Sequence, residues 1–345
     1  MDIKSLNLDE LKQLMKDISQ PSYRAGQIYD WMHNKLATDY DSMSNIPESL
    51  REILKKEYPY TVLTIDRMQE SATDGTRKYL FALPDGNFVE SVFMRYKHGN
   101  SVCISSQVGC RMGCKFCAST LGGLVRSLEP SEMVEQIYAI TRDTGERVSN
   151  IVIMGIGEPL DNYDNLIRFY KLITDEKGLN ISGRNITVST CGIVPNIYKL
   201  ADEHLSLTLA ISLHATTDEK RRSIMPIANE YTIREVTDAC KYYADTTGRR
   251  ISIEYSLIGG VNDSVAEAEQ LGVIASKMGA HINLIPVNPV KERGFVRGDR
   301  SAIEAFKNKL EKNANNVTIR REIGQDIDAS CGQLRHKRMN STDYD

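Results

Sequence analysis

The chain has 345 residues, of which 41% are hydrophobic and 26% charged, with a mean hydropathy of -0.36 and a formal net charge of -3. These values are ordinary for a globular protein, and they argue against extensive disorder and against a generally basic nucleic-acid binder. The apolar runs are far shorter than the roughly 20 residues of a membrane helix, and no secretory signal begins the sequence, so we expect a cytoplasmic protein without membrane attachment. Seven cysteines in such a chain favour metal binding or catalysis over a disulfide framework.

The first part of the chain has the periodicity of amphipathic helices. Residues 7–58 place apolar side chains such as Leu11 and Leu14 at helical spacing. From residue 61 to residue 96 the pattern changes to three strand-like runs separated by Asp-Gly turn signals. We therefore predict a helical accessory domain over residues 1–60 and a β-meander linker over residues 61–96.

Beyond residue 97, short β-rich runs alternate with helical segments, which is typical of parallel βα units. The runs are VCISS, NIVIMG, NITVST, LTLAISLH, ISIEYSLIG, INLIPV and NVTIRR. About six such units over residues 97–334 predict an α/β fold with a partial (β/α)6 barrel, although an open doubly wound sheet fits the same pattern. Three helix starts carry predicted capping boxes, at Thr232/Glu235, Ser264/Glu267 and Ser301/Glu304. Residues 335–345 are expected to form a flexible tail.

Three cysteines, Cys110, Cys114 and Cys117, stand in one short segment with C-x3-C-x2-C spacing. They could bind zinc with His98 as fourth ligand, but structural zinc sites usually draw pairs of ligands from two segments. A [4Fe-4S] cluster takes four ligands, so three cysteines leave one iron open. Following the first strand of a βα barrel, this spacing resembles the radical S-adenosylmethionine (SAM) superfamily, in which the open iron binds the amino and carboxylate groups of SAM.

Each predicted strand ends in glycine or polar residues, at the edge where active sites of βα barrels gather. Gly157 lets the backbone approach a ligand closely, and the Glu158 carboxylate suits the ammonium group of SAM. The other strand-end residues are Ser189, Ser212, Leu213, His214 and Asn288. Alone, a Gly-x-Gly is more often a turn and a histidine more often a core residue. Together, at successive strand ends, these residues favour a SAM site.

The sequence resembles one family within this superfamily more closely. The motifs are CISSQVGCRMGCKFC, MGIGEPL, STCGIVP, ISLHA, MPI, INLIPVNP and GQDIDASCGQL. They are similar to those of the RlmN family, which methylates carbon 2 of adenine in ribosomal and transfer RNA, and the resemblance extends to about Leu334. The sister Cfr family methylates adenine C8 and shares most of the pattern. Pro159 is typical of RlmN where Cfr sequences tend to have alanine, so C8 methylation is the alternative activity.

The resemblance implies a role for each matching residue. It makes Cys110, Cys114 and Cys117 the cluster ligands, and it makes Gly157, Glu158, Ser189, Ser212, Leu213, His214 and Asn288 the SAM contacts. Cys331 would become methylated, Cys103 would form a transient disulfide with it, and Glu90 would accept a proton. Glu90 is the least specific of these matches, because a glutamate in an alternating strand usually faces solvent and Cys103 is an alternative base.

Adenine C2 lies between two ring nitrogens and is too electron-poor to attack the methyl group of SAM, so a radical route is needed. The resemblance implies two SAM molecules for each methylation. One methylates the Cys331 thiolate, and the other is cleaved by an electron from the cluster to give a 5'-deoxyadenosyl radical. This radical removes a hydrogen from methyl-Cys331, and the resulting carbon radical adds to C2. After the C2 proton is lost to a base, attack by Cys103 on the Cys331 sulfur releases the RNA. The disulfide then requires an external reductant.

The resemblance also implies the partners: 23S rRNA in its peptidyl-transferase region, tRNA at the adenine 3' of the anticodon, and a reductant protein of flavodoxin or ferredoxin type. We expect a monomer. The helical domain is expected to dock RNA because it lies outside the predicted barrel, and the basic clusters near Arg293, Arg297 and Arg335 are expected to contribute positive charge to the same task.

Some features remain open at this stage. Asp326 and Asp328 are close to Cys331 in sequence and should disfavour its thiolate unless they point away. Cys191 and Cys240 are expected to be packing residues. An iron-sulfur electron carrier or a zinc-stabilised RNA-binding module is the competing interpretation, although neither needs the strand-end residues of a SAM pocket. A radical SAM activase is a third, and it would need no second cysteine pair.

Overall fold

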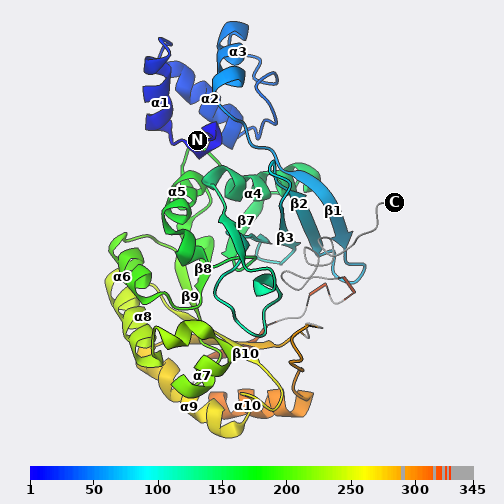
Figure 1. Ribbon diagram of the computed structural model, residues 1–345, viewed down its shortest axis with the longest axis vertical. Coiled ribbons are helices and arrows are strands. Elements are labelled where there is room, and N and C mark those ends of the chain that lie inside the picture. Colours follow the sequence, from blue (N-terminus) through cyan, green and yellow to red (C-terminus); the bar gives the residue numbers. More distant parts are fainter. Residues whose placement is uncertain (289–291, 314–315, 321–322, 325, 328–345) are drawn as a thin grey trace.

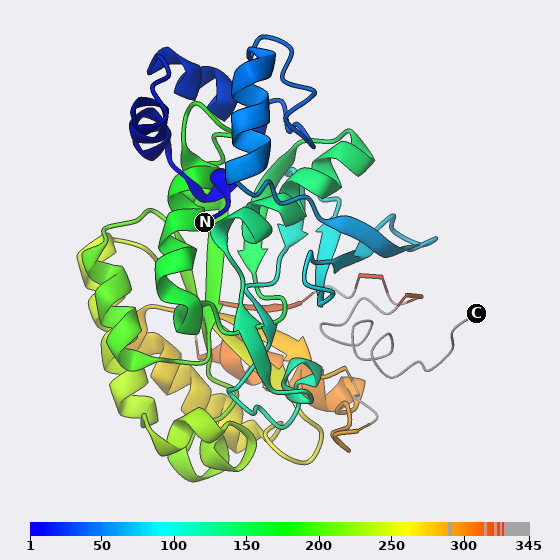
Figure 2. The same cartoon turned by 45° about the horizontal axis from the view of Figure 1, so that its top comes forward.

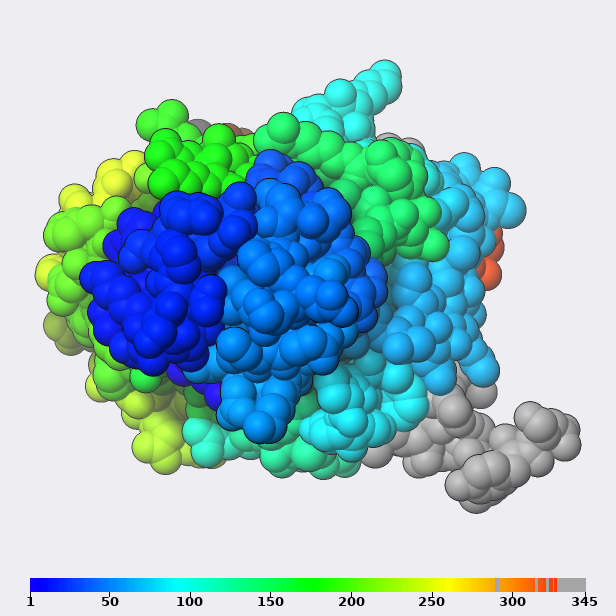
Figure 3. All heavy atoms as spheres, turned by 90° about the horizontal axis from the view of Figure 1, so that it is seen from above, coloured from blue at the N-terminus to red at the C-terminus, as the bar shows by residue number. Residues whose placement is uncertain are grey.

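The computed structural model describes residues 1–288, 292–313, 316–320, 323–324 and 326–327. Three helices form a layer at the N-terminus, shown in blue at the top of Figure 1: α1 (Leu8–Asp17), α2 (Tyr23–His33) and α3 (Glu48–Glu57). Seen from above, they cover one end of the molecule (Figure 3). The predicted helical character of residues 7–58 is therefore confirmed.

Buried polar contacts attach these helices to the rest of the chain. Lys4 lies in a short 3-10 helix, η1 (Ile3–Ser5), and its Nζ forms a 2.8 Å ion pair with Glu135 Oε2 on α4 (Pro130–Thr144), with both side chains fully buried. Ser5 Oγ accepts a hydrogen bond from the Ser131 amide at 3.0 Å. Because a buried charge is stable only when it is paired, the Lys4 contact fixes the N-terminal layer on α4.

Three antiparallel strands follow: β1 (Thr64–Glu70), β2 (Arg77–Ala82) and β3 (Phe88–Met94). They correspond to the predicted β-meander. Strand β3 also pairs antiparallel with β4 (Asn100–Cys103), where Val92 lies opposite Cys103. The meander therefore extends the sheet of the barrel, with its last strand beside the first barrel strand.

The barrel strands lie in the order of the chain, and each pairs in parallel with the next. They are β4 (Asn100–Cys103), β7 (Val148–Ile153), β8 (Ile186–Thr190), β9 (Thr208–Ser212), β10 (Ser252–Leu257), β11 (His281–Pro286) and β12 (Val317–Ile319). A doubly wound sheet reverses its strand order at a switch point, and this sheet does not. The predicted partial barrel is confirmed, and the doubly wound alternative is wrong.

Helices cover the outer face of the curved sheet, as Figure 2 shows. They are α4 (Pro130–Thr144), α5 (Tyr163–Thr174), α6 (Val194–Asp202), α8 (Ile233–Thr247), α9 (Val265–Met278) and α10 (Arg300–Lys312). The short helix α7 (Asp218–Ile224) lies instead at the carboxyl ends of β8 and β9. The short 3-10 helices are η1 (Ile3–Ser5), η2 (Ala118–Thr120), η3 (Pro159–Asn162), η4 (Gly183–Asn185) and η5 (Pro226–Asn229). No described helix is long and apolar enough to cross a bilayer.

Two of the three predicted capping boxes are present, at the starts of α8 and α9. The third is wrong, because α10 begins at Arg300 with Asp299 as its N-cap residue. Ser301 is thus already inside the first turn, where its side chain cannot cap the helix. The core between sheet and helices is apolar, and strand residues such as Ile151 and Ile253 are fully buried in it.

Candidate active site

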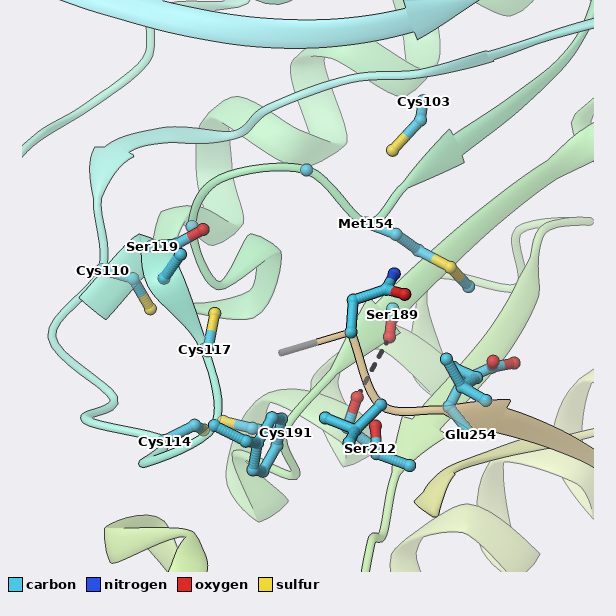
Figure 4. Close-up of a pocket in the computed structure, with 18 of the residues that line it drawn as sticks. Cys103, Cys110, Cys114, Cys117, Ser119, Met154, Ser189, Cys191, Ser212 and Glu254 are labelled. Carbon is cyan, nitrogen blue, oxygen red and sulfur yellow. Dashed lines mark hydrogen bonds between the residues drawn. The ribbon is translucent and has the colours of Figure 1, made fainter. Parts of the chain in front are cut away.

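The carboxyl ends of the parallel strands surround a cavity of about 550 Å³. Active sites of βα barrels lie at this end, because the loops after the strands converge there. Of the predicted site residues, the cavity is lined by Glu90, Cys103, Cys110, Cys114, Cys117, Gly157, Glu158, Ser189, Ser212, His214 and Asn288. Figure 4 shows Cys110, Cys114 and Cys117 on one side and Cys103 on the other.

The two sides of the cavity are formed by different residues. The cysteine-loop wall consists of Cys110, Cys114, Cys117, Glu158 and His214. The meander wall consists of Glu90 and Cys103 with the adjoining Lys78.

The three cysteines are held by a small antiparallel hairpin that sequence reasoning missed. Strands β5 (Gln107–Gly109) and β6 (Leu124–Ser127) pair with each other, and the Cys110 amide donates to Gly123 O at 2.9 Å. Gly109 has φ +78°, and a Cβ there would lie 1.9 Å from the same carbonyl oxygen, so only glycine fits. Strands this short carry too little alternation to be recognised in a sequence.

Side-chain hydrogen bonds stabilise the cysteine loop. Thr120 Oγ1 donates to Cys114 O at 3.1 Å and to Cys117 O at 3.0 Å. The Arg293 guanidinium, which we expected to face RNA, donates to Thr120 Oγ1 at 2.6 Å. Arg293 therefore supports the cysteine loop.

The three thiols suit an iron-sulfur cluster better than a single zinc ion. Among the described residues, no three His, Cys, Asp or Glu side chains lie close enough to hold one metal ion, whereas a [4Fe-4S] cluster binds each thiolate through a different iron. His98, the alternative zinc ligand, is exposed, stacks on Tyr96 and does not line the cavity. Burial raises the pKa of Cys110 to about 12 and also raises the pKa of Cys114, so these thiolates need the positive charge of a metal.

The loop after β7 is pressed against the loop after β4. Gly157 has φ +113°, and a Cβ there would lie 2.8 Å from the Gln107 amide nitrogen and 2.8 Å from Ser106 Oγ. Glycine is thus required at this position by contact with protein atoms as well as by its place on the cavity wall.

The Glu158 carboxylate is held by backbone amides. Its Oε1 accepts a hydrogen bond from the Leu160 amide at 3.0 Å, and its Oε2 accepts one from the Cys191 amide at 2.8 Å. Burial raises the pKa of Glu158, while these amide bonds favour the anion. Each carboxylate oxygen can still accept a second bond, so the group is fixed in place and able to bind a cation.

His214 is a neutral hydrogen-bond donor at the end of β9. Burial lowers the pKa of His214 to about 3, and its Nδ1 accepts a hydrogen bond from the Ser256 amide at 2.9 Å. The single proton of the neutral ring must therefore be on Nε2. Nearby, the hydroxyl oxygens of Ser189 and Ser212 lie 3.4 Å apart on adjacent strands.

Sequence reasoning missed Glu254, a buried carboxylate on β10 that lines the cavity. Its Oε1 accepts from Ser252 Oγ at 2.9 Å, and its Oε2 accepts from Asn283 Nδ2 at 2.7 Å. Glu254 is the single charged residue in the run ISIEYSLIG, and a charge within a predicted strand was the signal that could have marked it as a site residue. Cys191 is buried and also lines the cavity, whereas Cys240 is fully buried in the core as expected.

On the meander wall, Glu90 is buried and paired. Lys78 Nζ lies 2.8 Å from Glu90 Oε2, and the two side chains are 0% and 3% exposed. The solvent-facing interpretation of Glu90 is therefore wrong. Cys103, at the end of β4, is also buried, and burial raises the pKa of its thiol.

Comparisons with known proteins agree with this geometry. The sequence pattern of the radical SAM superfamily matches residues 104–271, and that of the ribosomal RNA large subunit methyltransferase N-terminal domain matches residues 1–58. A protein of Lachnospira eligens, described as a probable dual-specificity RNA methyltransferase RlmN, is 61% identical over 99% of this chain and 98% of its own. This chain belongs to the RlmN family. A second relative with the same description, from Lachnoclostridium phytofermentans, is 57% identical over 99% of this chain and 96% of its own.

The RlmN assignment is supported by a solved structure. The crystal structure of a radical SAM methyltransferase from Sphaerobacter thermophilus matches with a TM-score of 0.92 and 42% identity, over 96% of this chain and 98% of that one. The predicted family and the predicted radical SAM barrel are thus confirmed. The C8, electron-carrier, zinc-module and activase alternatives find no support in these relatives.

Among the described site residues of the RlmN pattern, Leu213 alone does not line the cavity. Leu213 is fully buried in the apolar core, and its amide donates to Glu254 O at 3.1 Å, so only its backbone is near the site. Cys331 lies outside the described residues.

The described residues before Cys331 are anchored on the turn between β1 and β2. Asp326 accepts hydrogen bonds from Ser71 Oγ at 2.6 Å and from the Ala72 amide at 2.8 Å, and these contacts lower the pKa of Asp326. The Asp326 carboxylate is therefore bonded to this turn, while Asp328, the other aspartate near Cys331 in sequence, lies outside the described residues. Ile327 lines the cavity, and the four residues from there to Cys331 can span at most about 14 Å.

Proposed function

We propose that this chain is a radical SAM methyltransferase that methylates carbon 2 of adenine in 23S rRNA, in the peptidyl-transferase region, and in tRNA, 3' of the anticodon. The observation that carries the proposal is that one cavity joins the cysteine-loop wall to the thiol of Cys103 on the opposite side. An electron carrier would need only the cysteine-loop wall. RNA as the substrate class follows from membership of the RlmN family.

Cys110, Cys114 and Cys117 are the proposed ligands of one [4Fe-4S] cluster per chain. When bound, the cluster supplies the electron that cleaves SAM. The hairpin of β5 and β6 and the Thr120 hydrogen bonds keep the cysteine loop in position. They would thereby keep the three thiols on the cavity wall, where they could hold the cluster.

The proposed SAM contacts are Gly157, Glu158, Ser189, Ser212, Leu213, His214 and Asn288. Glu158, fixed by two amides, is placed to bind the ammonium group of SAM. His214 offers a neutral Nε2 donor, so it can bind an acceptor atom without adding charge. Leu213 contributes through its backbone, since its side chain is in the core.

Cys331 is the proposed methyl acceptor and Cys103 its disulfide partner. Two SAM molecules are consumed per methylation, one as methyl donor to Cys331 and one as radical source. The anchoring of Asp326 keeps the chain before Cys331 close to the cavity. Glu90 is the proposed acceptor of the C2 proton, and Lys78 keeps its carboxylate compatible with burial.

We further propose roles for the parts of the chain and for its partners. Residues 1–60 would form the RNA-docking domain, residues 61–96 the meander linker, residues 97–334 the barrel with its catalytic loop and residues 335–345 a tail. Arg297, which lines the cavity, and Arg335 are proposed RNA contacts. A flavodoxin- or ferredoxin-type protein would reduce the cluster and the disulfide. We place the protein in the cytoplasm as a monomer.

The proposal is tested with RNA carrying deuterium at adenine C2 or C8. After reaction with the cluster-loaded protein, mass spectrometry should find the C2 deuterium lost from methylated adenosine and the C8 deuterium retained. Loss of the C8 label would make the protein a C8 methyltransferase. Absence of methylation despite a loaded cluster and SAM cleavage would overturn the RNA assignment. Cys331→Ala serves as the inactive control.

A further inference from the structure

Arg221 on α7 is fully buried and has an unusual set of partners. Its Nε donates to Leu213 O at 3.2 Å, and its Nη2 donates to Cys191 O at 2.5 Å and to Ser212 O at 3.4 Å. These carbonyl groups are at the carboxyl ends of β8 and β9. Its Nη1 has no hydrogen-bond partner among the described residues.

Other fully buried cations of the described chain have carboxylate partners. Lys4 pairs with Glu135 and Lys78 pairs with Glu90, each at 2.8 Å. Arg221 is bonded only to neutral carbonyl oxygens in the described part of the chain, and a guanidinium has five N–H donors. A buried charge without a countercharge is costly, so an anion bound beside Arg221 would stabilise it.

The cysteine loop lies against the helix that carries Arg221. The Lys115 amide donates to Ile224 O at 2.9 Å at the end of α7, and a Cβ on Gly113 would lie 3.2 Å from Pro226 Cγ, in the following η5. Cys114 and Cys191 pack in one cluster with Ile224 and Met225, which follow Arg221 closely in the chain. Gly192, which follows Cys191, also lies against Arg221, since a Cβ at this position would be 3.4 Å from Arg221 Nη2. The guanidinium therefore lies directly beside the chain that leaves β8.

We infer that Arg221 is the buried countercharge of the cluster site and that its guanidinium stabilises the negative charge of the thiolate-bound cluster. The inference rests on the proposed function, since it takes Cys110, Cys114 and Cys117 as the ligands. On reduction, one electron passes from the external reductant to the cluster, no covalent bond changes, and Arg221 stays protonated. A fixed positive charge favours the more negative, reduced state. Arg221 thus raises the reduction potential of the cluster.

The experiment compares cluster-loaded wild-type protein with Arg221→Met, Arg221→Lys and Arg222→Met. Arg222 is the matched control, because it is the next residue on α7 and is exposed. The midpoint potential of the cluster is measured without SAM by an EPR-monitored titration with dithionite, and SAM affinity is measured separately on the oxidised protein. We expect Arg221→Met to shift the reduction equilibrium about tenfold toward the oxidised cluster, which is about 59 mV for one electron. Arg221→Lys should recover most of that shift, and Arg222→Met should leave the potential unchanged.

Each outcome decides the inference. Equal potentials in wild type, Arg221→Met and Arg222→Met would overturn it. An unchanged potential with weakened SAM affinity would assign Arg221 to the SAM carboxylate and would also overturn it. Should Arg221→Met retain its circular dichroism but take up no iron, recovered iron uptake in Arg221→Lys supports the inference, and no recovery overturns it. A wild-type protein that takes up no cluster would instead refute the proposed function.

Discussion

The two walls of the cavity are built differently. On the cysteine-loop wall, the polar groups are held by backbone amides: Glu158 accepts from two of them, and His214 Nδ1 accepts from a third. On the meander wall, Glu90 is held by the side chain of Lys78. The cysteine-loop wall is therefore fixed by the barrel backbone. The meander wall depends on a side-chain contact, and other residues could take the place of those side chains.

This difference fits two separate tasks. A bound cofactor must stay in one place, and backbone amides on a barrel provide rigid positions for it. Cys103, by contrast, would have to form and break a disulfide in each cycle, while Glu90 would take up a proton. We therefore expect substitutions on the cysteine-loop wall to abolish SAM chemistry, and substitutions on the meander wall to stop the reaction at a later stage.

The largest effect is expected for the cluster ligands. Replacing Cys110, Cys114 or Cys117 singly by alanine should abolish both iron incorporation and SAM cleavage. Iron analysis and detection of cleaved SAM after anaerobic reconstitution provide the measurement. Cys240→Ala, in the core, is the matched control and should retain both. A complete cluster in any of the three variants would show that the ligand set is wrong.

Removing Lys78 should destabilise the fold. Lys78→Met leaves the Glu90 carboxylate buried without its cation, and the free energy of unfolding should fall by roughly 3–5 kcal/mol. Urea unfolding of the apoprotein measures this change. The double substitution Lys78→Met with Glu90→Leu should recover most of the loss. If the single variant is as stable as wild type, the pair does not hold the meander wall together.

His214 should make the cysteine-loop wall sensitive to acid. Its pKa is about 3 in the folded protein and about 6.5 when unfolded, so the unfolded state binds the extra proton between these values. Stability is therefore fully present above pH 6.5 and falls as the pH drops, with a loss of about 2 kcal/mol at pH 5. In urea unfolding, His214→Gln should lose less stability than wild type between pH 7.5 and pH 5. Equal losses would show that His214 is not buried in its neutral form.

A smaller effect is expected at the anchor of the C-terminal segment. Asp326→Asn weakens the bonds from Ser71 and the Ala72 amide, so methylation of Cys331 should slow while SAM affinity stays unchanged. Mass spectrometry of the Cys331 peptide over time gives this rate. Asp17→Asn, on α1, controls for the loss of one surface charge. A rate equal to that of the control would contradict the anchoring role.

The parallel strands could be predicted from the sequence because β-rich runs alternate with helical segments. The polar strand ends could be predicted because these residues directly follow the runs. The local signals were weaker elsewhere. The hairpin of β5 and β6 is too short to show a pattern. The burial of Glu90 depends on Lys78, a residue of a neighbouring strand, and the carbonyl partners of Arg221 come from two other strands. Such pairings arise from tertiary packing, and they have no signature within one stretch of chain.

The most direct test of the division between the walls is the covalent state of the RNA in cysteine variants. With SAM, reductant and RNA, Cys103→Ala should accumulate protein covalently attached to RNA, because the bridge from Cys331 to C2 forms but no thiol opens it. Cys331→Ala should form no adduct. A denaturing gel shows the adduct as a band that ribonuclease removes, and peptide mapping should place it on Cys331. Normal turnover by Cys103→Ala, or an adduct on Cys191 or Cys240, would contradict this account.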